Sequence, residues 1–541
     1  MKPGKELLFC ALGGSGEIGM NVNLYGCDGK WLMVDLGMTF SGNEYPGVDL
    51  VFADLEFIEE RADDLVGIVL THAHEDHIGA VPYFGEELGV PLYATPFTAR
   101  LIMGKLEEAG IADRVELNVI DHLDLFNLGP FGIRYVPLAH SIAEGNALLI
   151  DTPYGRIFHT GDWKLDDEPI IGEPTTAEEL TEIGDEGVLA LVCDSTNVFN
   201  PNASGSEGVV HRELVEEVKK HRGKRVLVTT FASNVARLQT LGEVARATNR
   251  KLCVAGRSLD KIIAAGKASG YLRDLPDTVD FDTAMSLPRG EVLIVATGGQ
   301  GEPRAALARV AEGNHPISLD PGDVVLFSSR QIPGNEVAIG KIMNKLAEDE
   351  IELVTDRQSM IHVSGHPGRP ELEALYGWLR PEMLVPVHGE MRHMREQAKV
   401  GREAGIGKTI VQKNGDLIRL APNGPAKLDE VRNGRLVLDG DIIAPADGEA
   451  VVMRRRLSYA GVVSVAVAPS GEIGIATMGL PLDEDYDDFT QEAAEDVAEA
   501  LKKVRGKDYA DRHEAVRLAA RRAATRWCGT KPQVQVLLFE D

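Results

Sequence analysis

Four side chains that commonly bind metal ions lie within six residues of one short stretch, THAHEDHIGA (71–80). They are His72, His74, Asp76 and His77. The preceding run LVGIVL is apolar and β-branched, which predicts a buried strand, and the residues that follow have a helical pattern. Because α/β proteins place their chemistry where a strand ends and a helix begins, this turn is the first candidate for a functional site.

Three further residues with metal-binding side chains follow apolar strands elsewhere in the chain: His140, Asp162 and His388. Two ions held side by side need imidazoles and carboxylates that arrive from several directions, which strand ends can provide. The H-x-H-x-D-H spacing can send alternate side chains to one ion and the Asp–His pair to a second. We therefore predict a site for two divalent ions, zinc first, with manganese or magnesium as alternatives because they accept similar nitrogen and oxygen ligands.

Two residues beside this set have more than one interpretation. Asp35, at the end of the predicted strand WLMV, is either a carboxylate that orients a ligand histidine or part of a strand-terminating turn. His159 lies inside its predicted strand, which indicates a core histidine or one that supports a ligand.

The elements that must position these residues alternate between short apolar strands and helical patterns, which indicates layered α/β domains. Strands followed by loops and helices begin again at about residue 209, as expected of a second, parallel sheet. Pro and Gly near 422–427 and 444–450 indicate a linker, and the tail predicts a small α+β module. We expect a first domain over 1–208, an inserted domain over 209–357, a return to the first domain over 358–450, and a C-terminal domain over 451–541.

The composition limits the compartment more than the function. The chain has 541 residues and a formal net charge of −28, which favours solubility and repels phosphate at long range. The segment 211–273 departs from this balance, with fourteen Lys or Arg against five Asp or Glu, and predicts either a solvated helical surface or a phosphate-binding face. Five scattered cysteines, no signal-peptide pattern and no apolar run long enough for a membrane span predict a cytoplasmic protein without a membrane partner.

Taken together, THAHEDHIGA, His140, HTGD (159–162) and VHGE (387–390) resemble the metallo-β-lactamase superfamily of dinuclear metal hydrolases. Within it the chain is similar to the beta-CASP nucleases, and most of all to the ribonuclease J family, from GGSGEIGMN (13–21) to about residue 450. The resemblance implies an α/β fold: a metallo-β-lactamase αββα sandwich, an inserted beta-CASP α/β domain and a small α+β C-terminal domain that supports oligomerisation.

The resemblance also assigns roles to further residues. Asp194 in CDSTN, the HVSGH stretch (362–366) and His388 match three polar motifs of beta-CASP enzymes. A histidine in the third motif, here His388, favours an RNA substrate. The implied catalytic residues are Asp76, His77, Asp194 and His366. The implied contacts to phosphate or RNA are Ser233, Asn234, His362, Ser364, Gly365 and His366. Three positions depart from the family pattern without removing a metal ligand: the family usually has His where Ala236 stands, Ser where Gly299 stands and Pro where Ala143 stands.

We therefore expect metal-assisted hydrolysis of phosphodiester bonds in single-stranded RNA. In this scheme His72, His74 and His140 hold one ion and Asp76, His77 and His388 the other, with Asp162 as the bridging carboxylate. A proton reaches the leaving oxygen from His366, beside Asp194. The family further implies a 5′-to-3′ exonuclease that prefers 5′-monophosphate ends, endonuclease activity, roles in rRNA processing and mRNA decay, a homodimer or homotetramer, and RNA-decay proteins as partners.

Two other functions fit part of the same pattern. One is a small-molecule hydrolase of the same fold, acting on thioesters or lactones, and the other is a non-catalytic RNA-binding subunit. The inserted segment of about 150 residues with phosphate-style loops argues against the first. The complete set of ligand positions argues against the second.

Overall fold

A computed structural model of the chain describes residues 5–42, 44–121, 124–331, 335–504 and 508–539. The chain divides into two compact units, one formed by residues 1–39 and 52–433 and the other by residues 40–51 and 434–541. Each unit has its own hydrophobic core.

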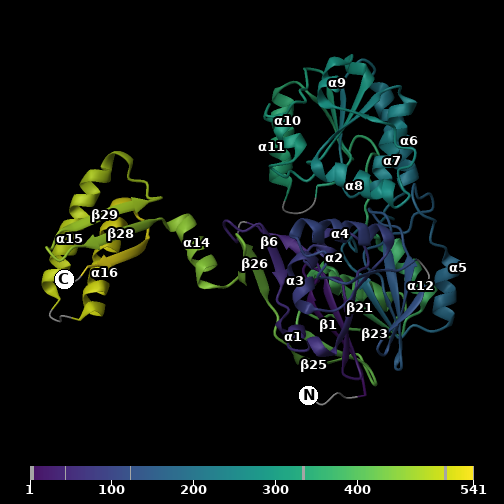
Figure 1. The fold of residues 1–541 in the computed structure, drawn as a ribbon, viewed down its shortest axis with the longest axis horizontal. Coiled ribbons are helices and arrows are strands. Elements are labelled where there is room, and N and C mark those ends of the chain that lie inside the picture. Colours follow the sequence, from purple (N-terminus) through teal and green to yellow (C-terminus); the bar gives the residue numbers. More distant parts are fainter. Residues whose placement is uncertain (1–4, 43, 122–123, 332–334, 505–507, 540–541) are drawn as a thin grey trace. The chain divides into compact units, whose positions relative to one another are not determined.

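Two sheets form the centre of the first unit (Figure 1). The eight-stranded sheet contains, in spatial order, β25 (Ala426–Glu430), β24 (Asp416–Ala421), β1 (Leu7–Gly13), β3 (Val22–Cys27), β4 (Lys30–Val34), β7 (Leu65–Val69), β8 (Leu92–Ala94) and β9 (Leu117–Val119). The seven-stranded sheet contains β10 (Leu125–Leu128), β11 (Phe131–Pro137), β12 (Asn146–Thr152), β13 (Gly155–His159), β14 (Ala190–Asp194), β21 (Met383–Val387) and β23 (Lys408–Thr409).

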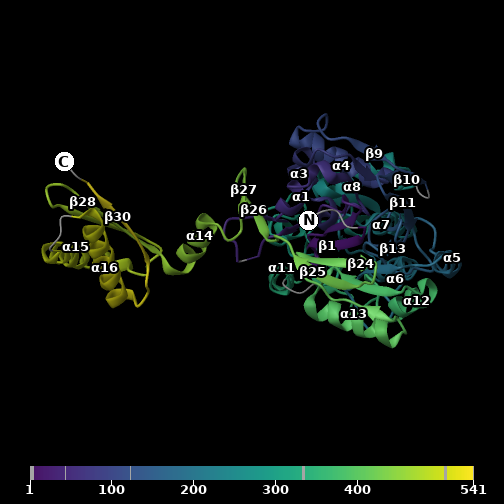
Figure 2. The same cartoon turned by 90° about the horizontal axis from the view of Figure 1, so that it is seen from below.

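The alternation of side chains along each strand builds the layers. In β12, Leu148 and Ile150 point into a core shared with the other sheet, while Leu149 packs on the opposite face. That face is covered by α5 (Ala177–Asp185), α12 (Arg369–Leu379) and α13 (Met391–Glu403). Helices α3 (Val81–Leu88) and α4 (Pro96–Ala109) lie on the other side of the strands from α12 and α13 (Figure 2). The predicted αββα sandwich is confirmed.

A third sheet, inserted between β14 and β21, consists of parallel strands. Its order is β17 (Thr278–Val279), β16 (Lys251–Ala255), β18 (Val292–Ala296), β15 (Val226–Thr229), β19 (Val324–Phe327) and β20 (Glu352–Val354). Its helices are α6 (Glu207–Lys220), α7 (Val235–Ala247), α8 (Arg257–Ala268), α9 (Phe281–Ser286), α10 (Ala306–Ala311) and α11 (Glu336–Glu348). The strands are almost wholly apolar, as parallel strands covered on both faces must be.

The insertion leaves its host sheet intact. Strands β14 and β21 are parallel neighbours, with Asp194 paired to Val387, although the whole inserted domain separates them in sequence. The chain therefore leaves the first domain at the carboxyl end of β14, and the returning segment passes this edge, where His366 contacts Asp194, before α12 leads to the amino end of β21.

The second unit contains the α+β module predicted from the tail. Strands β29 (Ile473–Met478), β28 (Val462–Val467) and β30 (Gln533–Leu538) form a three-stranded sheet in that order. One face of this sheet packs on α15 (Tyr486–Lys503) and α16 (Tyr509–Cys528). Helix α14 (Glu449–Ala460) and the hairpin of β26 (Arg435–Asp439) and β27 (Ile442–Pro445) precede it. Across the described residues, the longest helices are too polar to serve as membrane spans.

Candidate metal centre

Strand ends bring the predicted ligands to one edge of the sandwich. Strand β7 ends at Val69, and α2 (Glu75–Ile78) begins six residues later, so His72 and His74 lie on the turn and His77 on the helix. His140 follows β11, Asp162 follows β13 and His388 follows β21. Asp162 and four of the five histidines are buried, and His74 is half-buried.

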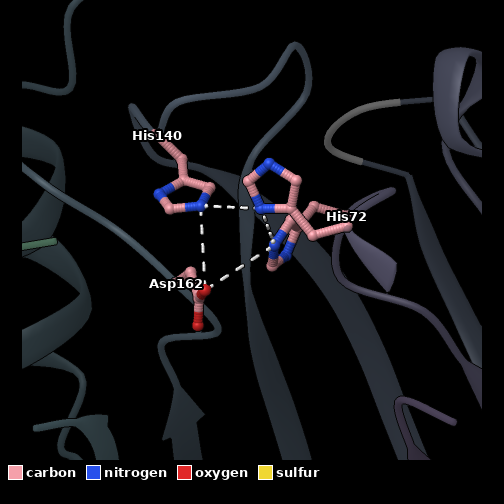
Figure 3. A group of neighbouring side chains, drawn as sticks. His72, His140 and Asp162 are labelled. Carbon is pink, nitrogen blue, oxygen red and sulfur yellow. Dashed lines mark hydrogen bonds and ion pairs between the residues drawn. The ribbon is translucent and has the colours of Figure 1, made fainter. Parts of the chain in front are cut away.

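The first group of ligands contains His72, His74, His140 and Asp162, whose donor atoms lie within 4.8 Å of one another. His74 Nδ1 lies 3.2 Å from His72 Nε2 and 3.1 Å from His140 Nε2. Asp162 Oδ2 lies 3.8 and 3.7 Å from the same two Nε2 atoms (Figure 3). Three imidazoles and one carboxylate oxygen thus point at a common position.

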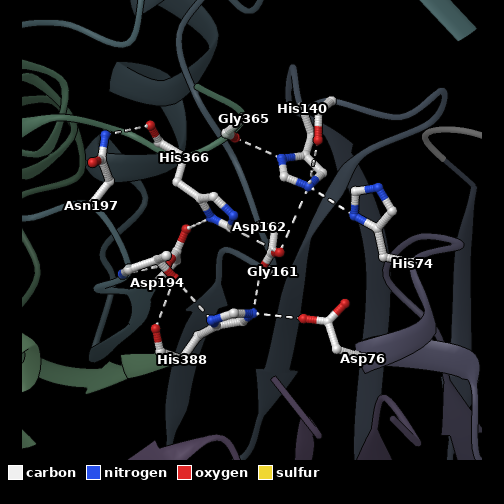
Figure 4. A network of polar contacts seen from close by, with 12 residues as sticks. His74, Asp76, His140, Gly161, Asp162, Asp194, Asn197, Gly365, His366 and His388 are labelled. Carbon is white, nitrogen blue, oxygen red and sulfur yellow. Dashed lines mark hydrogen bonds and ion pairs between the residues drawn. The ribbon is translucent and has the colours of Figure 1, made fainter. Parts of the chain in front are cut away.

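The second group contains Asp76, His77, His388 and again Asp162. His388 Nε2 lies 3.1 Å from Asp76 Oδ2 (Figure 4). Asp162 faces this group with its other oxygen, because Oδ1 lies 3.3 Å from His77 Nε2 and 3.4 Å from His388 Nε2. The structure therefore produces the two sets proposed from the H-x-H-x-D-H spacing, with Asp162 between them.

The residues fit two divalent cations. Asp162 Oδ1 is buried and has no hydrogen-bond partner, an arrangement that is costly unless a cation satisfies the oxygen. Burial lowers the pKa of His74 to about 4 and holds the pKa of His72 and His140 well below the usual range, so these imidazoles are neutral and can donate a lone pair. Burial opposes the charged form of His388, but Asp162 and Asp76 outweigh it and raise its pKa to about 9. The carboxylates of the second group thus favour a positive charge at this position, and a metal ion can supply that charge in place of a proton.

Asp35 contacts a candidate ligand histidine, as expected if this carboxylate orients a ligand. Its Oδ2 accepts a hydrogen bond from His77 Nδ1 at 2.7 Å, and its Oδ1 accepts one from the backbone N–H of Thr71 at 2.8 Å. The turn interpretation also fits this residue, since Asp35 directly follows β4 and has a φ of 64°, in the left-handed region. His159 instead bonds through Nδ1 to the Tyr25 hydroxyl at 2.8 Å, inside the core.

His366 and Asp194 lie together at the rim of the centre. His366 Nδ1 is 2.8 Å from Asp194 Oδ2 and 4.0 Å from Asp162 Oδ2. Burial opposes the charged imidazole of His366, but Asp194 and Asp162 outweigh it and raise its pKa. A histidine next to the ligands whose charged form is favoured by two carboxylates is suited to proton transfer.

The predicted phosphate contacts divide into two sets. Ser233 Oγ lies 3.1 Å from His74 Nε2, and the Gly365 carbonyl accepts a hydrogen bond from His140 Nδ1 at 2.6 Å, so both reach the centre. Ser364 Oγ lies beside them and accepts a bond from the backbone N–H of His366 at 3.1 Å.

The other two residues have different surroundings. Asn234 is buried, and its side-chain oxygen caps α7 by accepting from the Arg237 N–H at 2.9 Å. His362 lies outside the ligand groups, next to Phe231, with a buried Nδ1 and a pKa lowered to about 3 by burial and by the charge of Arg237.

Two threonines that the sequence analysis did not identify also touch ligands. Thr71 Oγ1 lies 3.0 Å from His72 Nδ1, and Thr196 Oγ1 lies 2.9 Å from His388 Nδ1. Thr71 could have been found as the residue directly before a ligand, whereas Thr196 reaches His388 only through the pairing of β14 with β21.

Comparisons with known proteins agree with this geometry. Family models match residues 18–189 (metallo-beta-lactamase superfamily), 223–346 (ribonuclease J, beta-CASP domain) and 350–411 (Zn-dependent metallo-hydrolase RNA specificity domain). Ribonuclease J of Sinorhizobium meliloti is 41% identical over 554 residues, covering 99% of this chain and 98% of that protein. The chain therefore belongs to the ribonuclease J family.

Other members of the ribonuclease J family are more distant. Ribonuclease J 1 of Streptococcus pyogenes is 36% identical, covering 86% of this chain and 84% of that protein, and ribonuclease J of Mycolicibacterium smegmatis is 35% identical, covering 96% and 94%. A solved structure of a protein of unknown function from Enterococcus faecalis shares the fold, with a TM-score of 0.55 and 18% identity over 76% of this chain and 100% of that one.

The departures from the ribonuclease J pattern have visible consequences. A Cβ at Gly299 would lie 2.9 Å from the Cβ of Ser329, so a serine there would need its neighbour to move. Ala236 lines a cavity of about 640 Å³ that opens beside His140 and is also bounded by Ile142 and Tyr271. A larger side chain at this position would occupy part of that cavity.

The basic segment 211–273 has fewer cations free to bind phosphate than its net charge suggests. Arg237 and Arg250 are buried, the first against Glu207 and the second against backbone carbonyls. Several exposed cations are paired as well, for example Arg212 with Glu168 at 2.6 Å and Lys224 with Glu352 at 2.5 Å. Much of the local positive charge is thus compensated by carboxylates from outside the segment.

Proposed function

We propose that this chain, a metal-dependent ribonuclease of the ribonuclease J family, is a 5′-to-3′ exonuclease on single-stranded RNA. It prefers 5′-monophosphate ends, also cuts internally, and acts in RNA maturation and decay. Two divalent ions, zinc first, are held by His72, His74, His140, Asp76, His77 and His388, with Asp162 bridging them.

The observation that carries the proposal is the position of Asp162 between two ligand groups, with one oxygen directed at each. Two divalent ions held in this way lower the pKa of water and stabilise negative charge on a phosphoryl oxygen. The protein's own contribution is to fix those positions, since every ligand histidine has its second nitrogen in a hydrogen bond.

Proton transfer to the leaving oxygen is assigned to His366. Asp194 lies 2.8 Å from His366 Nδ1 and fixes the orientation of the ring. The other nitrogen, Nε2, is then the one that can exchange a proton with RNA. Its neighbour Asn197 donates to the His366 carbonyl at 3.2 Å and holds the backbone on which this side chain depends (Figure 4).

The 5′-phosphate contacts are assigned to Ser233, Ser364, Gly365 and His362, with Asn234 supporting the loop from behind. The Ser233 hydroxyl accepts from His74 and still has its own hydrogen to donate to a phosphate oxygen. A pocket of fixed size accepts a monophosphate end and rejects a bulkier triphosphate end.

The two rival functions have less support. A small-molecule hydrolase would have no evident use for a separate six-stranded domain inserted between β14 and β21. A non-catalytic RNA-binding subunit is expected to lose ligands, whereas here both groups are complete.

We also propose a cytoplasmic homodimer or homotetramer that works with other RNA-decay proteins. The three-stranded sheet of the second unit packs its helices on one face only. Met478, Leu537 and Phe539 are 75%, 46% and 55% exposed, which is a surface suited to a second copy of the chain.

The experiment that tests this function uses single-stranded RNA with either a 5′-monophosphate or a 5′-triphosphate, digested with zinc or manganese supplied. Wild-type protein is expected to release mononucleotides faster from the monophosphate substrate. His77→Ala should abolish release, and His211→Ala, which alters a partly exposed histidine paired with Glu243, should not. Internal cuts indifferent to the 5′ end would refute the end preference, and no cleavage under any of these conditions would refute the nuclease assignment.

A further inference from the structure

The five ligand histidines differ in which part of the chain holds their second nitrogen. Three are held by residues of the sandwich that precede the inserted domain in sequence: His72 by Thr71, His77 by Asp35 and His388 by Thr196. The other two belong to the first ligand group and are held by residues that come later: His74 by Ser233 and His140 by the Gly365 carbonyl.

Ser233 lies on the first strand-to-helix loop of the inserted domain, between β15 and α7. The loop is tied down by its own hydrogen bonds, because Asn234 N–H donates to the Phe231 carbonyl at 3.2 Å and the Asn234 side chain caps α7. Helix α7 is fixed in turn by Arg237, whose guanidinium is wholly buried and donates to Ile361 O at 3.0 Å. The position of the Ser233 hydroxyl is therefore set by the inserted domain and by its return connection.

Gly365 makes the second contact through close approach of its backbone. A Cβ at this position would lie 2.9 Å from His140 Cε1 and 2.7 Å from Ser141 Oγ, which only a glycine avoids without a shift. The carbonyl of Gly365 points at His140, and His74 lies on the other side of the same imidazole (Figure 4). Two segments outside the first 208 residues thus orient two of the three imidazoles in the first group.

We infer that Ser233 is a positioning residue for metal binding, and that docking of the inserted domain sets the affinity of the first ligand group for its ion. When Nδ1 of His74 binds a cation, Nε2 carries the proton, and Ser233 Oγ accepts it in a hydrogen bond. Among the residues that the structure describes, the imidazoles of the second group take no such contact from the inserted domain, so removal of the Ser233 hydroxyl should act first on the ion of the first group. This inference rests on the dinuclear centre of the proposed function but not on RNA polarity or end preference.

The test measures retained metal rather than activity. Full-length protein is loaded with zinc and dialysed against a series of chelator-buffered free zinc concentrations, and the bound zinc per chain is measured by plasma mass spectrometry. Wild-type protein should show two ions. Ser233→Ala should weaken one of them about 10- to 100-fold, the usual effect of removing a residue that orients a ligand, and Ser233→Thr should restore it.

Matched variants identify the ion that is affected. Thr196→Val, which removes the partner of His388, should weaken the other ion, and Gly365→Ala should weaken the same ion as Ser233→Ala. In a His74→Ala background, where the first group is already broken, Ser233→Ala should have no further effect. Two ions in wild-type protein with unaltered affinities in Ser233→Ala would overturn the inference alone. A wild-type protein that retains no ion would overturn the proposed function and this inference with it.

Discussion

Asp35→Asn tests whether a single buried carboxylate orients the second ligand group. Asp35 has a φ of 64°, a left-handed conformation that aspartate and asparagine tolerate, so this substitution keeps the backbone unstrained. Alanine at the same position would add a strain of about 1–2 kcal/mol and confuse the result. The asparagine variant also preserves the shape of a side chain that is fully buried.

The magnitude follows from the hydrogen bonds. Both oxygens of Asp35 accept, Oδ1 from the Thr71 N–H at 2.8 Å and Oδ2 from His77 Nδ1 at 2.7 Å. Asparagine has only one acceptor oxygen, so its NH2 group must face one of these two donors or force His77 to move its proton to Nε2, where the metal lone pair is needed. One lost buried hydrogen bond costs about 1–3 kcal/mol. At 1.4 kcal/mol for each tenfold, this corresponds to a loss of about 5- to 140-fold in affinity for the second ion.

The assay follows both metal binding and RNA cleavage against buffered free zinc. Asp35→Asn should shift the binding curve of the His77 ion to higher zinc and move the activity curve by the same factor, with activity recovering when zinc is in excess. Asp151→Asn, a conservative change on a half-buried residue of β12 paired with Arg156, is the control. An unchanged affinity for the second ion would show that Asp35 only terminates its strand.

Two further outcomes are expected. Arg237→Met leaves the Glu207 carboxylate buried without the guanidinium that donates to it at 3.0 and 3.2 Å. The free energy of unfolding, measured by urea titration with metal held constant, should therefore fall by about 3–5 kcal/mol. Adding Glu207→Leu to the same chain should recover part of the loss. A loss below about 1 kcal/mol for the single variant would contradict the buried pair as a structural element. Deletion of residues 461–541 removes the exposed sheet of the second unit and should lower the number of chains per particle in light scattering, whereas an unchanged number of chains would exclude this sheet as the oligomer contact.

The candidate metal ligands could be brought together from sequence because their signal is local. Each follows an apolar run by a few residues, and the carboxyl ends of neighbouring strands meet at one edge of a sheet. The H-x-H-x-D-H spacing also predicted the division into two groups, since the turn sends His72 and His74 one way and α2 turns His77 the other way. The parallel sheet of the inserted domain was predictable for a similar reason, its strands being uninterrupted apolar runs.

The rest depends on contacts between distant segments. A serine and an asparagine side by side at 233 and 234 are equally polar in sequence, yet one faces His74 and the other caps its own helix. From sequence, the positive charge of 211–273 predicts a basic surface. In the structure, carboxylates from other segments, such as Glu168 and Glu352, pair with part of that charge. Strand β29 was not identified because its small residues, in IGIATM, leave only a weak apolar alternation.

The point of insertion explains why the inserted domain and the metal centre affect each other. A domain placed in a loop at the far edge of a sheet could vary its position without touching the ligands. Here the chain departs after Asp194, at the carboxyl end of β14, and the returning segment passes the same edge before α12 leads to the amino end of β21. At this edge the Ser233 loop and Gly365 come within hydrogen-bond distance of His74 and His140. A displacement of this domain away from the sandwich would stretch the contact between Ser233 and His74, so on the inference above the affinity of the first ion would report on how closely the domain is docked.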